Sequence, residues 1–330
     1  MLITGCHRSG TSLLAAVVAQ CVVEERNNDL TPLVDNPKGY FESHTLRNCN
    51  DHLLGNIGYS WHQPPLHPLA WQSGSRLKLL AEQRPLFRQW DSSCDWVDKD
   101  PRLCITYGAF EHILLQRAPL AVSLRAPQEV AHSLLKRDGI SVAKGLLIWW
   151  LYNRCISVEL RAGDPVLLYQ ELLTWPQGSP MQHASLNTLW EWLSKNLNNT
   201  TKLGKDPESL RQKSLTLIEP TLQRSDQNLV IESGLPKQLL ELCNDIYIRI
   251  ERAPSADRLA VMQRCFDGIP GWLANAYEEI LFLGEPDLEY LRSQPLDHSV
   301  DLREEVMSLK RSTSWRLTQP LRWLGDALKG

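Results

Sequence analysis

Paired cysteines, strong net charge and long apolar runs are all missing from this sequence. Its eight cysteines are scattered without a C-x-x-C pair, which argues against a zinc site and, in a chain of 330 residues, favours reduced thiols in a cytoplasm. The formal net charge of −3 implies no general affinity for nucleic acid. No apolar run reaches the roughly eighteen residues of a membrane span, and we recognise no secretory leader. We therefore expect a soluble, cytoplasmic protein without a metal site.

The first two dozen residues predict a strand, a tight turn and a helix. Leu2–Thr4 is apolar enough for a buried strand, Gly5–Ser12 is bounded by turn-forming residues, and Leu13–Val23 is an apolar helical run. A turn of this kind places several backbone N–H groups around one point at a helix N-terminus. Such a point favours an anion.

A lysine is missing from the turn. The spacing of Gly5, Gly10 and Ser12 fits the P-loop pattern G-x-x-x-x-G-K-[ST], but Thr11 stands in the place of the lysine and the basic residue is Arg8. NTP-hydrolysing and kinase sites need that lysine on the β- and γ-phosphates. The loop therefore indicates a different phosphorylated ligand.

Strands alternate with helices in the first half of the chain. Beyond the first strand, further strands are expected at about 95–98, 120–124 and 165–169, and helices at 42–54, 77–90, from 107, 128–137 and 145–160. This alternation predicts an α/β fold, a P-loop NTPase-like three-layer α/β/α core with a mainly parallel sheet. Beyond about Thr174 only helices are expected, at 186–197, 207–218, 235–251, 256–266, 271–282 and 300–328. We expect one domain over 1–250, with its ligand-binding core in about 1–175, and a helical extension over 251–330.

A second anion-binding pattern follows the strand at 120–124. Arg125 comes at the carboxyl end of that strand, where open α/β sheets bind ligands. Ser133 lies about two helical turns further on, and Arg137 one more turn along the same face. An arginine fork and a hydroxyl around one point form a specific phosphate site. The alternative is an ordinary surface arginine and a helix serine.

These two patterns carry a resemblance to a known family. The run Arg8–Ser12 resembles the loop with which sulfotransferases hold the 5′-phosphosulfate of PAPS (3′-phosphoadenosine 5′-phosphosulfate). Leu124–Leu134 resembles the R-x-P-x-x-V-x-x-S-type strand and helix of that family, whose Arg and Ser bind the 3′-phosphate. Lys99–Arg102 and Asn36–Glu42 are similar to bacterial members. The resemblance covers roughly residues 1–175.

The resemblance implies that PAPS is the co-substrate and that no metal is needed. It assigns donor binding to eight residues: Arg8, Ser9, Gly10, Thr11, Ser12, Arg125, Ser133 and Tyr169. Many family members carry a lysine where Arg8 stands, and because an arginine keeps its proton, acid assistance by Arg8 is in doubt. Tyr169 begins a segment similar to the family's Y-E-D-L, from which Gln170 departs.

The acceptor hydroxyl must lose a proton, which requires a nearby base. Glu42 is the first candidate for this base; the alternative is an acid next to the N-cap of the 42–54 helix. Asp100 is the second candidate; the alternative is an ordinary surface ion pair between Lys99 and Asp100. The resemblance implies that Lys99 contacts the sulfonate. His7 is either a spacer or a catalytic residue. Trp61, and with it Trp71, lies in a loop rich in His and Pro where an aromatic ring can stack on a sugar.

The C-terminal run 310–323 holds basic and aromatic residues and no acid, which is typical of a helix that docks on its own domain or on an anionic membrane surface. Its sequence is similar to tails of bacterial enzymes that build surface polysaccharides. We therefore predict a PAPS-dependent sulfotransferase with a carbohydrate or glycolipid hydroxyl as acceptor. The alternatives are a P-loop kinase for a small metabolite and a non-catalytic nucleotide-binding scaffold in polysaccharide assembly.

Overall fold

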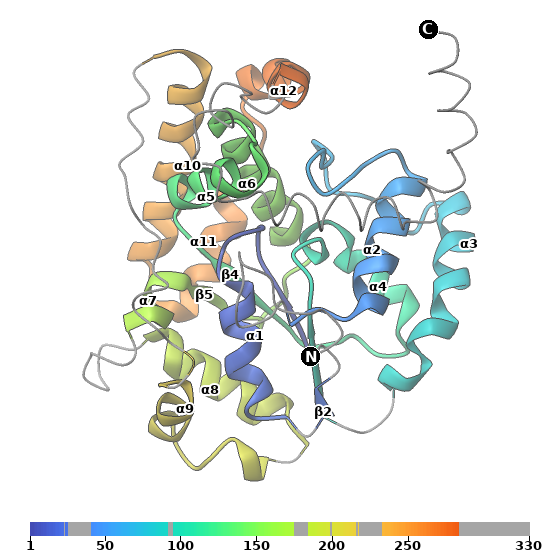
Figure 1. The fold of residues 1–330 in the computed structure, drawn as a ribbon, viewed down its shortest axis with the longest axis vertical. Coiled ribbons are helices and arrows are strands. Elements are labelled where there is room, and N and C mark those ends of the chain that lie inside the picture. The colour runs from blue at the N-terminus through green and yellow to red at the C-terminus, as the bar shows by residue number, and fades with distance from the viewer. Residues whose placement is uncertain are drawn as a thin grey trace, which may run out of the picture. The chain divides into compact units, whose positions relative to one another are not determined.

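The structure is a computed structural model that describes residues 1–22, 24–25, 41–91, 95–174, 184–198, 200–215, 217 and 233–283. These residues belong to one compact unit, Met1–Pro286 (Figure 1). The predicted helix at 300–328 and the basic, aromatic run 310–323 lie outside the described residues. In the described part, no helix is both long and apolar enough to cross a membrane.

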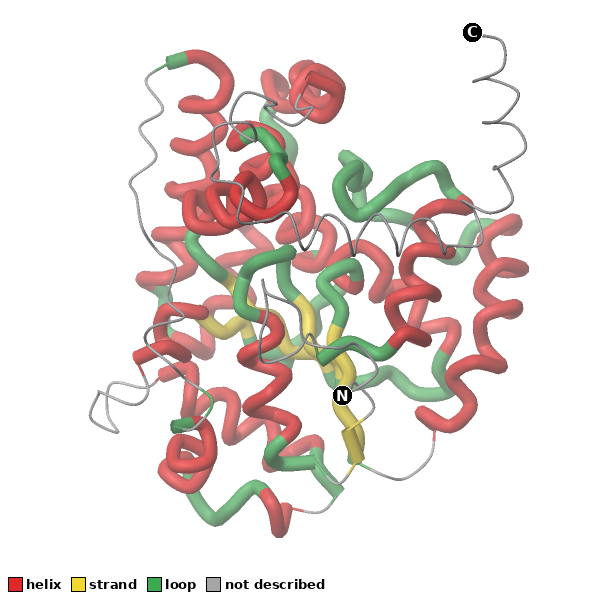
Figure 2. The backbone as a smooth tube through the Cα atoms, viewed as in Figure 1, coloured by secondary structure: helices red, strands yellow, loops and turns green. Residues whose placement is uncertain are grey.

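A parallel sheet forms the centre of the unit (Figure 2). Its described strands are β1 (Leu2–Thr4), β2 (Glu24–Glu25), β3 (Trp96–Lys99), β4 (Leu120–Leu124) and β5 (Val166–Leu168). They are ordered β2-β3-β1-β4-β5, and each neighbouring pair is parallel. The strand β1 therefore lies between β3 and β4, and the chain crosses β1 to pass from one to the other. Helices on both faces complete the predicted α/β three-layer fold, which the structure confirms.

Twelve α-helices are named among the described residues. They are α1 (Thr11–Ala19), α2 (His44–Asn56), α3 (Gly74–Gln83), α4 (Leu103–Ile113), α5 (Pro127–Asp138), α6 (Val142–Ser157), α7 (Tyr169–Thr174), α8 (Ala184–Asn196), α9 (Pro207–Ser214), α10 (Gly234–Arg252), α11 (Arg258–Cys265) and α12 (Gly271–Leu283). Short 3₁₀ segments follow α3 at Arg84–Asp91, precede α9 at Thr200–Lys202 and precede α11 at Ser255–Asp257. Figure 1 shows α2, α3 and α4 on one side of the sheet region and α1, α8 and α9 on another.

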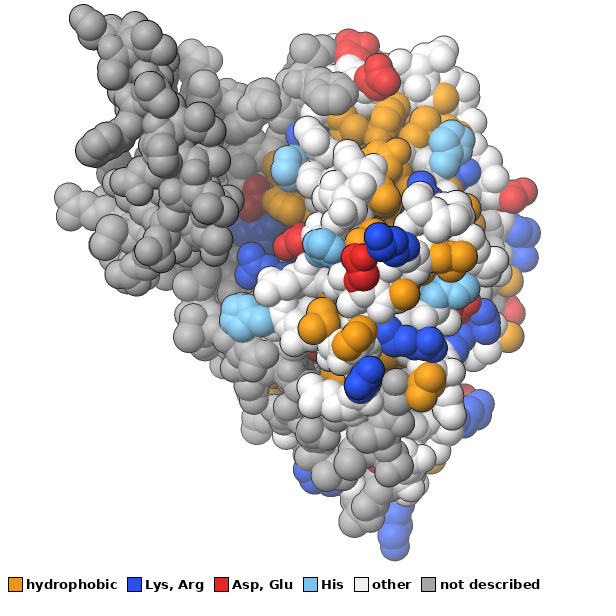
Figure 3. All heavy atoms as spheres, turned by 90° about the vertical axis from the view of Figure 1, so that its right-hand side faces the viewer, with side chains coloured by type: hydrophobic (Ala, Val, Ile, Leu, Met, Phe, Trp, Pro, Cys, Tyr) orange, Lys and Arg blue, Asp and Glu red, His pale blue; other side chains and the backbone are white. Residues whose placement is uncertain are grey.

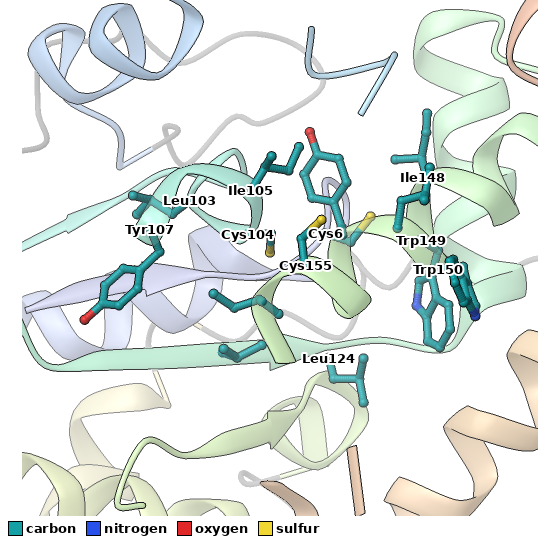
Figure 4. Packing of buried hydrophobic residues seen from close by; sticks show 14 of the residues in the cluster. Cys6, Leu103, Cys104, Ile105, Tyr107, Leu124, Ile148, Trp149, Trp150 and Cys155 are labelled. Atoms are coloured by element: carbon teal, nitrogen blue, oxygen red, sulfur yellow. The ribbon is translucent and has the colours of Figure 1, made fainter. Parts of the chain in front are cut away.

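Side-chain alternation along the strands gives each face of the sheet its own core. Leu2 packs in one buried cluster, which includes side chains from α4, α6 and α10, and the next residue, Ile3, packs in the other, which includes side chains from α1 and α8. In the same way, Leu120 joins the first cluster and Ala121 the second. Successive strand residues point to opposite faces, so a parallel sheet covered on both sides needs an unbroken apolar run. Figure 4 shows part of the first cluster, including Cys6, Cys104 and Cys155.

Several predicted boundaries differ from those observed. The first helix begins at Thr11 instead of Leu13, and the helix expected from Tyr107 begins at Leu103. The helix expected at 77–90 is an α-helix only to Gln83 and a 3₁₀-helix from Arg84 to Asp91, because Pro85 has no N–H to continue the α-helical pattern. The last strand ends at Leu168, and Tyr169 already belongs to α7.

The helices α11 and α12 lie within the predicted C-terminal extension. Both contact α6, and α11 also contacts α10. Phe266 and Leu273, from the region of these helices, are buried in the same cluster as residues of the sheet. The predicted boundary at 250 stays a prediction, since residues 284–330 lie outside the described part.

The surface beside α3 mixes side chains of every class (Figure 3). Leu77 and Leu86 are about half exposed, at 47% and 51%, and basic, acidic and histidine side chains are interspersed on this face. Single exposed apolar residues of this kind are normal on a folded protein.

Candidate functional site

The carboxyl ends of four strands place the predicted site residues at one edge of the sheet. The P-loop follows β1, Lys99 ends β3, Arg125 follows β4 and Tyr169 follows β5. In a parallel sheet these ends meet at one edge, and ligands bind where neighbouring strands lead to opposite sides. β1, which lies between β3 and β4, is at that position. The order of the strands therefore brings the two predicted phosphate patterns together.

The loop after β1 holds three residues at positive φ. Gly5 has φ 149°, Arg8 has φ 66° and Gly10 has φ 83°. A side chain on Gly5 would place its Cβ 2.2 Å from the carbonyl oxygen of Ser123, so only glycine fits there. Arg8 is one of two described residues other than glycine with positive φ, a conformation that costs energy and that clusters at functional sites.

Ser9 closes the loop on itself. Its N–H donates to the Cys6 carbonyl at 3.1 Å, and its hydroxyl donates to the same oxygen at 2.5 Å. The Ser123 hydroxyl on β4 donates to the Ser9 carbonyl at 2.6 Å. The Ser9 N–H, which the resemblance assigns to the donor, therefore donates within the loop in this structure, and the Ser9 hydroxyl does the same.

Arg8 joins the two phosphate patterns directly. Its Nε donates to the Ser133 hydroxyl on α5 at 2.8 Å. Arg125 donates from Nη1 to the Arg8 carbonyl at 3.0 Å. Residues more than a hundred positions apart thus meet around one point, a contact that the two sequence patterns did not predict. The partner of Ser133 is nevertheless Arg8, where the sequence analysis grouped the hydroxyl with Arg125.

Arg125 has partners that the sequence analysis did not name. Its Nε lies 2.6 Å from Oε2 of Glu129, one turn along α5, and Gln170 donates to the same oxygen at 3.0 Å. The guanidinium carbon of Arg125 is 4.7 Å from the centre of the Tyr169 ring, within cation–π range. The i,i+4 spacing of Arg125 and Glu129 was the available signal for this ion pair.

Tyr169 also lies against the P-loop. A Cβ built on Gly10 would fall 2.0 Å from Cδ2 of Tyr169, so the ring occupies the space a side chain at position 10 would need. Gly10 is the N-cap of α1, and Thr11, in the first turn, is buried. Ser12 follows in the same turn. The N–H groups at such a helix start suit an anion.

On the other side of β1, the last residue of β3 pairs with the segment before α2. Nζ of Lys99 forms an ion pair with Oε1 of Glu42, and the two side chains are 2% and 11% exposed. Phe41, with φ 52°, bends the chain directly before Glu42. Glu42 thus directly precedes the N-cap of α2, Ser43, which accepts from the Leu46 N–H at 3.1 Å, and its buried carboxylate pairs with Lys99.

Asp98 fixes the same segment from the neighbouring position on β3. Its Oδ1 accepts from the Ser43 N–H at 3.1 Å and from the Lys99 N–H at 2.7 Å, and the Ser43 hydroxyl donates to Oδ2. Burial raises the pKa of Asp98 to about 7 against the lowering effect of these hydrogen bonds. The sequence predicts only a strand at Asp98, because a strand pattern does not reveal which distant segment binds a carboxylate.

Asp100 has a different partner from the one expected. It is fully buried, and its carboxylate accepts from Arg102 Nη1 at 3.1 Å instead of pairing with Lys99. Arg102 in turn lies 2.6 Å from Oδ1 of Asp51 on α2. The alternative of a surface ion pair between Lys99 and Asp100 is therefore wrong. The Asp100 carboxylate is buried and paired with Arg102, so it is not an exposed base.

His7 is buried in the P-loop at 8% exposure. Its ring lies 4.7 Å from that of Trp61 and 5.5 Å from that of Tyr152, measured between ring centres. Burial, with the positive charges of Arg102, Arg137, Lys99 and Arg8, holds the pKa of His7 well below its usual value. Burial and these charges therefore favour the neutral form of the His7 imidazole.

The two tryptophans suggested for sugar stacking differ in position. Trp71 is 3% exposed and donates from Nε1 to the Ile105 carbonyl at 3.3 Å, so it belongs to the core, and stacking by Trp71 is wrong. Trp61 is only partly buried and lies beside His7, and its carbonyl accepts from the Tyr152 hydroxyl at 2.8 Å. The loop that carries Trp61 therefore borders the P-loop.

Comparison with known proteins gives few matches. No family model matches this chain, and no curated protein matches it. Among solved structures, the chain is similar to a sulfotransferase domain from the olefin synthase of Synechococcus PCC 7002, with 18% identity, a TM-score of 0.37 and coverage of 73% of this chain and 92% of that one. It is also similar to a sulfotransferase domain from the curacin biosynthetic pathway, with 14% identity, a TM-score of 0.39 and coverage of 73% and 95%. At these TM-scores neither likeness assigns a function.

Proposed function

We propose that this protein is a sulfotransferase that moves the sulfuryl group of PAPS to a hydroxyl, with a carbohydrate or glycolipid as acceptor. The observation that carries the proposal is the hydrogen bond from Arg8 Nε to the Ser133 hydroxyl at 2.8 Å. It joins the two phosphate patterns that the sequence identified independently. A P-loop without its lysine and a second arginine–hydroxyl pair at the same edge suit a ligand with two separated phosphate groups.

The donor is held, in this proposal, on the β4–β5 side of the site. The start of α1, with Thr11 and Ser12, and the Arg8 guanidinium bind the 5′-phosphosulfate. Arg125 and Ser133 bind the 3′-phosphate. Tyr169 flanks the guanidinium of Arg125, 4.7 Å from its ring centre. An arginine fork matches a phosphate through two donors at once, which supports donors with an extra phosphate over those without one.

The acceptor hydroxyl is activated, in this proposal, by Glu42. The Glu42 carboxylate takes the hydroxyl proton as the acceptor oxygen forms its bond to sulfur. The bond between sulfur and the 5′-phosphate oxygen breaks, and the negative charge that collects on that oxygen is stabilised by Arg8 and the N–H groups of the loop. Lys99, which is paired with Glu42, turns to the sulfonate when the donor is bound. The product nucleotide is PAP (3′-phosphoadenosine 5′-phosphate).

Location and acceptor class belong to the same proposal. The loop of Trp61 beside the P-loop supports a sugar acceptor, since aromatic rings stack on sugars through their apolar faces. Residues 310–323 would bring the protein to an anionic membrane surface, where glycolipid acceptors lie. A cytoplasmic position agrees with free cysteines: the described ones, such as Cys6 and Cys104, form no disulfide.

Calorimetric titration of PAP and of ATP tests the proposal. We expect PAP to bind and ATP to bind at least tenfold more weakly, because a bidentate arginine contact is worth about 1.5–3 kcal/mol. Arg125→Ala should lower the affinity for PAP. It should leave unchanged the affinity for adenosine 5′-phosphosulfate, which lacks the 3′-phosphate. Arg264→Ala, on the exposed face of α11, is the matched control. Tight ATP binding without PAP binding would instead support the kinase, and transfer of label from PAPS to a panel of sugars then identifies the acceptor.

A further inference from the structure

Gln170, the second residue of α7, contacts the ion pair that holds Arg125. Its Nε2 donates to Oε2 of Glu129 at 3.0 Å, and the same oxygen lies 2.6 Å from Nε of Arg125. Oε2 of Glu129 thus accepts from two donors at once. Because Gln170 belongs to α7 and Arg125 follows β4, this oxygen joins two segments of the nucleotide-binding edge.

The two partners of the Gln170 amide set its orientation. A carboxylate accepts hydrogen bonds and donates none, so the NH₂ group of Gln170 faces Glu129. On the other side, the Tyr247 hydroxyl on α10 donates to Oε1 of Gln170 at 3.1 Å. Burial raises the pKa of Tyr247 above its usual value, so this hydroxyl keeps its proton. α5 and α10 pack against each other and lie together above α7 in Figure 1.

Arg125 is held at its main chain and on one edge of its guanidinium. Trp149 donates from Nε1 to the Arg125 carbonyl at 2.9 Å, and Nη1 of Arg125 donates to the Arg8 carbonyl at 3.0 Å. Of the five N–H groups of a guanidinium, one on Nε and one on Nη1 are used in these contacts. The other three have no acceptor among the described residues, and the side chain is 10% exposed. These three N–H groups are the ones that can bind a phosphate.

The acids beside Gln170 already have basic partners, and Gln170 adds no charge of its own. Glu129 pairs with Arg125. Glu171, the next residue of α7, pairs with Arg258. A carboxylate at position 170 would take the place of a nitrogen that lies 3.0 Å from Oε2 of Glu129, and two carboxylates at such a distance repel each other. It would also add negative charge beside the arginine that is proposed to bind a phosphate.

We propose that Gln170 is a positioning residue for the 3′-phosphate of the donor. Its amide holds the Glu129 carboxylate on Nε of Arg125, which leaves the other N–H groups of the guanidinium for the ligand. Because the amide is neutral, this cluster does not repel the phosphate. Gln170 thereby favours a 3′-phosphorylated nucleotide over one without that group. This inference rests on the proposed function, in which Arg125 binds the 3′-phosphate.

Calorimetric titration of the full chain with PAP and with adenosine 5′-phosphosulfate tests this role. At pH 8 we expect Gln170→Glu to bind PAP at least about tenfold more weakly than the unchanged protein, because like charges that face each other cost binding energy. The affinity for adenosine 5′-phosphosulfate should fall less than about threefold, since its charged groups lie farther from position 170 and solvent screens them. Gln238→Glu, at an exposed position of α10, adds the same charge elsewhere and should leave both affinities unchanged.

The pH dependence separates the added charge from a general structural fault. The charged and titratable groups near position 170 are Glu171, Arg125, Glu129, Arg8, Tyr169, Tyr247, Glu251 and Arg258. Two carboxylates in contact share a proton, so a lower pH returns a donor to position 170 in Gln170→Glu. At about pH 5.5 its loss of PAP affinity, relative to the unchanged protein at the same pH, should shrink to less than about threefold.

Gln170→Met provides a second variant that carries no new charge. It removes the hydrogen bonds to Glu129 and Tyr247 and keeps a side chain of similar length. We expect a loss of PAP affinity of about threefold to fivefold, the size of a neutral hydrogen bond, and the same loss at pH 8 and pH 5.5. The difference between the two variants therefore measures the effect of charge alone.

Other outcomes would contradict the inference. Equal losses of affinity for both nucleotides in Gln170→Glu would show that position 170 does not act through the 3′-phosphate. A loss in Gln170→Glu that is the same at both pH values would assign the effect to packing. Unchanged PAP affinity in both Gln170 variants would remove this residue from the site. Failure of the unchanged protein to bind PAP would overturn the proposed function itself, and this inference with it.

Discussion

Lys99 at the end of β3 and Glu42 before α2 form a buried ion pair. The pair places the proposed base beside the proposed sulfonate-binding cation, on the same side of β1. In the proposed mechanism, Oε1 of Glu42 is released to the acceptor hydroxyl when Lys99 contacts another anion. Binding of the donor would supply that anion, which orders the two substrates.

Replacing Glu42 by Gln tests the base. We expect Glu42→Gln to lower the rate of transfer by about 10²–10⁴-fold, which is the usual contribution of a positioned base, with PAP affinity unchanged. The Gln carbonyl oxygen still accepts from Lys99, so the fold should be kept. Steady-state kinetics with labelled PAPS gives the rate, and Glu82→Gln, on the exposed side of α3, is the control. Full activity in Glu42→Gln would remove Glu42 from the mechanism.

Removing the Ser133 hydroxyl tests the junction of the two phosphate patterns. Ser133→Ala takes away both the acceptor for Arg8 Nε and the proposed contact to the 3′-phosphate. We expect PAP affinity to fall about tenfold, the size of one hydrogen bond to a charged group. The affinity for adenosine 5′-phosphate should fall less, since this nucleotide has no 3′-phosphate and is affected only through the orientation of Arg8. Ser75→Ala, an exposed position on α3, controls for the substitution. Equal losses for both nucleotides would mean that Ser133 acts on Arg8 alone.

A methyl group at position 10 tests the contact between the P-loop and Tyr169. In Gly10→Ala the new Cβ would overlap the Tyr169 ring at 2.0 Å, at φ 83°. Gly163 has φ 98° with nothing within 4 Å of a built Cβ, so Gly163→Ala measures the cost of positive φ alone, about 1–2 kcal/mol. We expect Gly10→Ala to lower the free energy of unfolding by more than this control does, and to abolish PAP binding. Equal stability losses would show that the tyrosine moves aside at no cost.

Asp98 makes the stability of the protein depend on pH. Its pKa in the folded protein is about 7, above the value near 3.9 of an unfolded chain. The folded state therefore holds more protons between these values, and the free energy of unfolding falls as the pH rises from about 4 to 7, by at most about 1.4 kcal/mol per pH unit for one group.

Asp98→Asn isolates this contribution, because an amide resembles the protonated acid in shape and charge. We expect its stability to depend less on pH over that range, and to exceed that of the unchanged protein at pH 8. Urea unfolding at several pH values from 5 to 8 makes the measurement. The same slope in both proteins would show that Asp98 does not titrate near 7.

The sequence was sufficient to predict those parts of the site that are formed by consecutive residues. The turn from Gly5 to Ser12 and the strand before Arg125 are local patterns, since the glycine positions predict the turn and a continuous apolar run predicts the strand. The strand order then brings Arg8 and Ser133 together without any further signal. The α/β class followed from the same alternation of strands and helices.

Contacts between distant segments were out of reach. Asp98 and Ser43 bind each other across 55 positions, because the burial of a polar side chain depends on what packs over it. Asp100 pairs with its near neighbour Arg102, while Lys99 pairs with the distant Glu42. Trp71 is buried in the core and donates to the Ile105 carbonyl, which its position in a loop rich in His and Pro did not predict. The short β2 was also not predicted, since Glu24–Glu25 has no apolar strand pattern.

β1 lies between β3 and β4, so it separates the residues proposed to bind the donor from those proposed to bind the acceptor. The proposed donor contacts Arg125, Ser133 and Tyr169 come from the β4–β5 half, and the proposed acceptor contacts come from β3 and the segments beside it. If the proposed roles are right, substitutions in the acceptor half change the choice of acceptor and leave the nucleotide contacts in place. We then expect a chimera that takes residues 41–73 from a sulfotransferase with another acceptor to accept that molecule and to bind the same donor.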